Sequence, residues 1–154
     1  MDLLSQRLRP VCFVRVSQSS VSPGVRVACI TVAATLGALV TLGARHAGVT
    51  ELFAAGGHLA VSGAAVGVAA LMGAVIHALW FSLWTALYAF VARAHRGLRT
   101  LGDAVLLAGV AYGCAAVAPS LAGPVSTLMT SEKVLVHVLL ALALATGMRL
   151  ARTW

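Results

Sequence analysis

The stretch from Leu52 to Ala92 contains no Asp, Glu, Lys or Arg. A helix needs about 20 mainly apolar residues to cross the hydrocarbon core of a bilayer, which is about 30 Å thick. The uncharged stretch is therefore too long for one ordinary span, and we expect one transmembrane helix preceded by a shorter segment. Aromatic residues fill its second half, and Trp84 and Tyr88 are expected towards the inner leaflet because Trp and Tyr favour membrane interfaces.

The composition of the whole chain also indicates a membrane protein. Hydrophobic residues make up 60% of its 154 residues and charged residues only 10%, whereas soluble domains carry roughly 25% charged residues. The chain has too few charged residues to form a surface that faces water, whereas a surface of apolar residues can face lipid. The length is that of a single domain.

The apolar runs predict an all-α fold, a four-helix transmembrane bundle. The expected spans are residues 26–44, 66–92, 103–122 and 132–151. They lie in a membrane domain covering residues 25–154. Residues 1–24 are expected to form a flexible cytoplasmic tail, with a signal peptide or a mitochondrial transit peptide as alternatives. Leu52–Gly67 is interpreted as a short interfacial segment before the second span, or alternatively as a re-entrant turn.

Local signals mark the ends of the third and fourth spans. Pro119 would kink or stop the third span, because proline has no backbone N–H and its ring clashes with the preceding turn. Thr130 or Ser131 could cap the fourth helix, with Glu132 favourable in its first turn.

Lys and Arg are distributed unevenly between the two expected sides of the membrane. With the N-terminus in the cytoplasm, only Arg45 and Lys133 lie outside. The nine residues on the cytoplasmic side are Arg7, Arg9, Arg15, Arg26, Arg93, Arg96, Arg99, Arg149 and Arg152. The positive-inside rule therefore predicts that both ends are cytoplasmic. The net charge is +7. The basic residues that produce it lie between the apolar runs and do not form a patch interleaved with aromatic residues, so nucleic-acid binding is not expected.

His77 and His137 are the candidate functional residues. Each lies in a span that runs from the outer to the inner face, at a similar distance before Arg93 and Arg152 respectively, so similar depths are expected. His77 also continues a stripe of small residues that begins at Gly63, which predicts that it faces other helices and not lipid. An ionisable group inside a membrane is a functional candidate by default.

Three interpretations of this histidine pair are open. The rings could hydrogen-bond a neighbouring helix or a water molecule and serve packing. They could bind a b-type haem or a metal ion between helices, or titrate near neutral pH in a proton-coupled role. The cysteines, Cys12, Cys29 and Cys114, form no CxxC motif and predict neither a zinc site nor a disulfide framework.

Small residues recur at spacings that allow helices to approach closely. The glycines predicted to pack against a helix are Gly37, Gly63, Gly67, Gly109 and Gly113. The last four form two GxxxG motifs. Contact within the chain is the first interpretation, and contact between copies is the second.

The segments HALWFSLWTALYAF from His77 and HVLLALALATG from His137 resemble the second and fourth spans of YagU-like proteins, a family of small four-span bacterial and archaeal membrane proteins. Gly56-Gly57 ahead of the second span and the Gly-rich third span fit the same family. The family often shows Tyr-Gly after the histidine, whereas here no glycine follows His137 until Gly147. The resemblance implies a four-span fold and a stress- or acid-related role.

No complete catalytic or phosphate-binding motif is found in the sequence. Asp103 and Glu132 lie at span ends, so the spans offer no carboxylate at mid-depth, which argues against a secondary transporter. The sequence predicts a non-enzymatic inner-membrane protein that packs in the lipid bilayer with itself or with a membrane-protein partner. The alternatives are a redox subunit holding haem b or a metal, and a small channel, transporter or pH-responsive protein.

Overall fold

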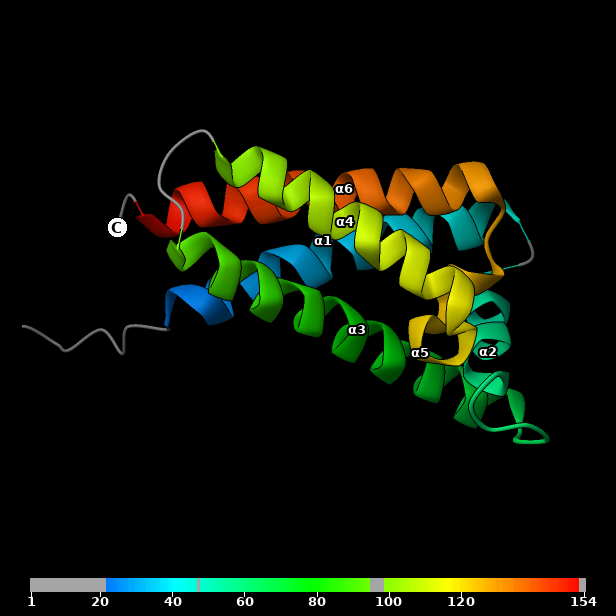
Figure 1. Cartoon of the computed structure of the whole chain (residues 1–154). Coiled ribbons are helices and arrows are strands. Elements are labelled where there is room, and N and C mark those ends of the chain that lie inside the picture. Colours follow the sequence, from blue (N-terminus) through cyan, green and yellow to red (C-terminus); the bar gives the residue numbers. More distant parts are fainter. Residues whose placement is uncertain (1–21, 47, 95–98, 153–154) are drawn as a thin grey trace, which may run out of the picture.

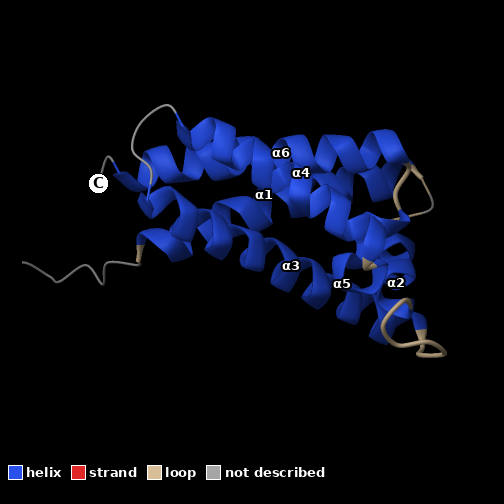
Figure 2. Ribbon diagram, in the orientation of Figure 1, coloured by secondary structure: helices blue, strands red, loops and turns tan. Residues whose placement is uncertain are grey.

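A computed structural model describes residues 22–46, 48–94 and 99–152. Within these residues the chain is helical, with short turns and loops between helices (Figure 2). The elements are α1 (Pro23–Arg45), α2 (Val49–His58), α3 (Val66–Ala94), α4 (Arg99–Val117), α5 (Pro119–Ala122), the 3-10 helix η1 (Gly123–Thr127) and α6 (Thr130–Arg152).

The four long helices α1, α3, α4 and α6 run alternately in opposite directions and form a bundle (Figure 1). α1 and α4 each contact both α3 and α6, so every long helix lies beside two others. The short helices α2 and α5 lie together at one end of the bundle (Figure 1). Arg93 and Arg99, at the end of α3 and the start of α4, therefore lie at the opposite end from Glu51 in α2, as the predicted order of spans requires.

Three of these helices are long and apolar enough to cross a membrane. They are Gly24–Arg45, Val66–Ala92 and Thr130–Leu150, and they correspond to the first, second and fourth predicted spans. Their length and composition are those of a multi-pass membrane protein. The apolar part of α4, Leu101–Val117, is shorter.

The helix in the predicted third span, 103–122, ends earlier than the span. α4 ends at Val117, and Ala118 leaves the helical backbone with φ −130° and ψ 68° before the separate short helix α5 begins at Pro119. Proline cannot donate the next helical hydrogen bond, and its ring disfavours helical backbone at the preceding residue. Pro119 thus stops the helix.

The start of α6 is capped differently from the sequence prediction. Thr130 is already the first helical residue, and the Oε2 atom of Glu132 accepts a hydrogen bond of 3.0 Å from the Met129 N–H. The carboxylate thus reaches back to the residue before the helix, as in a capping box. Its other oxygen pairs with Nε2 of His46, which follows the last residue of α1. Glu132 therefore also joins the end of α1 to the start of α6.

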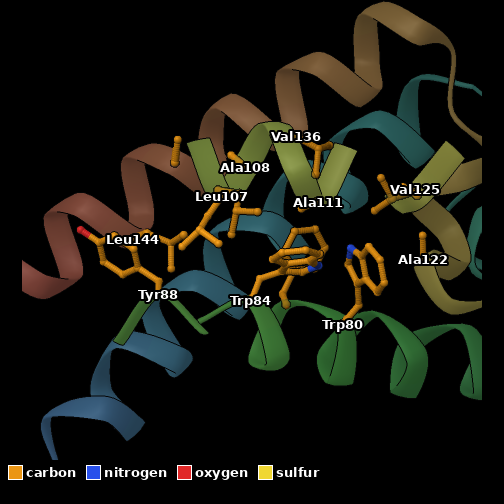
Figure 3. Close-up of a cluster of buried hydrophobic side chains, with 14 of the residues drawn as sticks. Trp80, Trp84, Tyr88, Leu107, Ala108, Ala111, Ala122, Val125, Val136 and Leu144 are labelled. Atoms are coloured by element: carbon orange, nitrogen blue, oxygen red, sulfur yellow. The ribbon is translucent and has the colours of Figure 1, made fainter. Parts of the chain in front are cut away.

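The core is built from large aromatic side chains on α3 and small ones on α4. Figure 3 shows Trp80, Trp84 and Tyr88 of α3 beside Leu107 and a row of alanines. The buried alanines of α4 are Ala104, Ala108, Ala111 and Ala115, which recur every three or four residues on one helix face. On α1 the buried face is Val27, Thr31, Thr35, Leu39 and Leu42.

Candidate functional site

His77 lies on the inner face of α3 and is only 1% exposed. The centroid of its ring lies 6.2 Å from that of Phe53 in α2 and 4.6 Å from that of Phe81 in α3. Its Nε2 atom lies 3.3 Å from Oγ1 of Thr35 in α1. The side chain therefore contacts three helices and not lipid, as its place in the sequence predicts.

Thr35 lies beside the Nε2 atom of His77. Its Oγ1 atom lies 2.9 Å from the Thr31 carbonyl oxygen, 3.2 Å from the Val32 carbonyl oxygen and 3.3 Å from His77 Nε2. The other ring nitrogen of His77 is Nδ1. It is buried, and no residue that the structure describes hydrogen-bonds to it.

His137, in α6, is 4% exposed. Its Nδ1–H donates a 2.6 Å hydrogen bond to the Lys133 carbonyl one turn earlier, and its ring meets that of Tyr112 in α4 edge to face at 5.4 Å. The Ala111 carbonyl also faces the ring. No hydrogen bond of ordinary geometry forms at Nε2 within the described residues.

The two histidines have different neighbours. No interaction among the described residues joins them, because α1 and α2 surround His77 whereas α4 borders His137. His77 Nε2 faces Thr35 and His137 Nδ1 faces Lys133, whereas His77 Nδ1 and His137 Nε2 have no hydrogen-bond partner among the described residues. Within the described residues no group of three or more His, Cys, Asp or Glu could hold a metal ion. The packing, haem or metal, and proton-coupled interpretations of the two rings stay predictions.

The glycines predicted to pack do not touch another helix within the described part of the chain. All five are exposed, and a Cβ atom on any of them would meet open space: Gly37, Gly63, Gly67, Gly109 and Gly113. Gly63 lies in the turn before α3 with φ +79°, so it forms no helical GxxxG motif with Gly67. The described structure therefore does not show the predicted contact within the chain at these glycines.

Other glycines make the closest helix contacts. A Cβ atom on Gly57 of α2 would lie 1.8 Å from the Ala69 carbonyl oxygen of α3, and one on Gly73 of α3 would lie 2.0 Å from the Phe53 carbonyl oxygen. On Gly56 it would lie 2.2 Å from the Pro124 nitrogen. α2 and α3 therefore pack backbone against backbone. The pair Gly56-Gly57 is visible in the sequence as a site where helices could approach closely. The sequence does not show that Gly57 packs beside Gly73.

No protein-family model matches the chain, and no curated protein or solved structure matches it. The resemblance to YagU-like proteins stays a prediction that rests on the segments beginning at His77 and His137.

Proposed function

We propose that the chain is a four-span protein of the inner membrane with both ends in the cytoplasm. In this proposal it has no catalytic role and acts by packing its lipid-facing helices against those of a second copy.

The outer surface of the bundle is the observation that carries the proposal. Large apolar side chains point outward along all four long helices, among them Phe90 at 75%, Leu106 at 68% and Val117 at 83% exposure. Soluble monomers rarely expose apolar patches larger than a few hundred Å². Such a surface is stable against lipid tails or against other transmembrane helices.

α4 supports a fourth crossing although it is short. Its apolar part, Leu101–Val117, measures about 25 Å at 1.5 Å per residue, which is slightly less than the hydrocarbon core. Beyond it the chain continues into α5 and η1, where Ala122, Pro124 and Val125 are buried. These residues extend the packed length at that end. In this topology α2 is the interfacial segment before the second span.

The outward side of α4 supports association between chains. A groove of about 300 Å³ lies between α4 and α6, with Gly109 and Ala108 on one side and Val138 and Ala141 on the other. Gly113, one turn from Gly109, is also open. In membranes, where helices gain no hydrophobic free energy by associating, small residues favour contact because backbones can come close.

We expect the double substitution Gly109→Ile and Gly113→Ile to weaken self-association by about tenfold, which corresponds to about 1.4 kcal/mol. The branched side chains would hold apart the backbones that touch in the dimer. Energy transfer between labelled chains in liposomes, measured against the protein-to-lipid ratio, gives the dissociation constant.

Ala86→Ile is the matched control, because Ala86 is exposed on α3. It should leave the dissociation constant unchanged. Equal weakening by the control, or a wild-type chain that stays monomeric at every protein-to-lipid ratio, would contradict association through α4.

A further inference from the structure

A cavity of about 400 Å³ lies between four segments at the end of the bundle where α2 lies (Figure 1). The end of α1, the first half of α2, η1 with the turn after it, and the first turn of α6 all line it. Binding sites for small molecules are cavities of about 300–1,000 Å³ with mainly apolar walls and a few polar groups. This cavity is within that range and joins residues that lie far apart in the chain.

Apolar side chains form much of the cavity wall, and ionisable side chains line the same space. The apolar residues are Leu42, Leu52, Ala55, Leu128 and Met129. The ionisable residues are His46, Glu51 and Glu132. No Lys or Arg that the structure describes lines the cavity. With two carboxylates and one imidazole, the cavity is negatively charged at neutral pH whether or not His46 carries a proton.

Both carboxylates come from the first turn of a helix. Glu51 lies in the first turn of α2, and its side chain folds back over Gly48, where an added Cβ atom would meet the carboxylate. Glu132 lies in the first turn of α6 and accepts a hydrogen bond from the Met129 N–H, while its other oxygen pairs with His46. Two helix starts that are far apart in the chain thus place their carboxylates at one cavity.

An organic cation fits this cavity better than a metal ion. Within the described residues no group of three or more His, Cys, Asp or Glu could hold a metal ion, and the apolar wall offers a metal no ligand. An ammonium group on an apolar molecule has other needs. Carboxylate oxygens accept from its N–H groups in charge-assisted hydrogen bonds, and its hydrocarbon part is stabilised by burial against apolar side chains. The cavity offers both kinds of contact.

We propose that the cavity binds an organic cation, with a primary ammonium group between Glu51 and Glu132. The apolar part of the molecule lies against Leu42, Leu52 and Leu128. A primary ammonium has three N–H donors, which the two carboxylates share. In the proposed topology the cavity is at the outer face of the membrane. There the ammonium comes either from a free amine in solution or from the headgroup of an aminophospholipid.

Isothermal titration calorimetry on the full chain tests the proposal, in nanodiscs of phosphatidylcholine, whose headgroup has no N–H donor. The probe is phenethylamine, and phenethyl alcohol, which has the same apolar part without the charge, is the control ligand. Empty nanodiscs correct for partition into lipid. We expect saturable binding of one amine per chain and binding of the alcohol that is weaker by about tenfold or more, since hydrogen bonds to charged groups contribute about this much.

Two variants separate the charge of the cavity from its space. Glu51→Gln should weaken the binding of phenethylamine by about tenfold, whereas Glu51→Asp, which keeps the charge, should weaken it less. Ala55 is exposed and lines the cavity, so the larger ring in Ala55→Phe should fill the space and abolish binding without a change of charge. Binding of one amine per chain does not require self-association through α4, so either proposal can fail without the other.

Phosphatidylethanolamine in the nanodiscs distinguishes the two sources of the ammonium. Weaker binding of phenethylamine in its presence would show that the lipid headgroup occupies the cavity, and unchanged binding would assign the cavity to a free amine. Three results would overturn the proposal. They are equal binding of the amine and the alcohol, equal binding of the amine by the wild-type and Glu51→Gln chains, and binding that persists in a folded Ala55→Phe chain.

Discussion

Replacing Gly57 or Gly73 by alanine is expected to lower the free energy of unfolding by about 3 kcal/mol, the upper part of the range for overpacked sites. The added methyl group would lie 1.8 Å from the Ala69 carbonyl oxygen in the first case and 2.0 Å from the Phe53 carbonyl oxygen in the second. Both obstacles are backbone atoms, which cannot rotate away as a side chain can. The α2–α3 contact would have to open to admit the methyl group.

Gly67→Ala provides the matched control. Gly67 lies on α3 like Gly73, but its Cβ position is open, so alanine there should be neutral or stabilise the helix by about 0.5–1 kcal/mol. Unfolding in detergent micelles, followed by circular dichroism as denaturing detergent is added, measures the three variants. A Gly73→Ala chain as stable as the Gly67→Ala chain would show that the backbones of α2 and α3 are not in contact.

Ala111→Leu is expected to destabilise the bundle by a similar amount, about 3 kcal/mol, because the core has no space for three further carbon atoms. Ala111 is fully buried and lies near Trp84 on the inner side of α4 (Figure 3). The aromatic side chains of α3 would have to move to accommodate leucine. The same unfolding titration measures the loss.

Ala116→Leu is the control on the same helix, since Ala116 is exposed. A surface substitution of this kind usually changes stability by less than about 0.5 kcal/mol. If Ala111→Leu and Ala116→Leu have the same free energy of unfolding, the helix face that carries Ala111 does not face the core.

The spans on α1, α3 and α6 could be predicted from the sequence because each is a long uncharged run with basic residues close by. The end of the third span, on α4, was harder to predict. Its apolar run continues past Val117, and the sequence left open whether Pro119 bends the helix or ends it. Hydropathy does not distinguish a helix that ends from one that kinks, because the residues after Pro119 are equally apolar.

The packing faces could not be predicted in the same way. In a soluble helix polar residues mark the outer face, but from Ala104 onwards α4 has no charged residue on any side. The rule that small residues meet therefore selected Gly109 and Gly113, whereas the face turned inward is the row of alanines beginning at Ala104. The burial of His77 was predictable from its own helix, but its partner Thr35 was not, because it lies on another helix.

The proposed topology has four crossings, with both ends in the cytoplasm. Reporter fusions test it, using a fluorescent protein that folds only in the cytoplasm and alkaline phosphatase, which is active only outside it. Fusions after Arg96 and after Trp154 should be fluorescent and lack phosphatase activity. Fusions after Arg45 and after Leu128 should show the reverse. Phosphatase activity after Arg96 together with activity after Arg45 would mean that α3 does not cross the membrane, and would contradict the four-span topology.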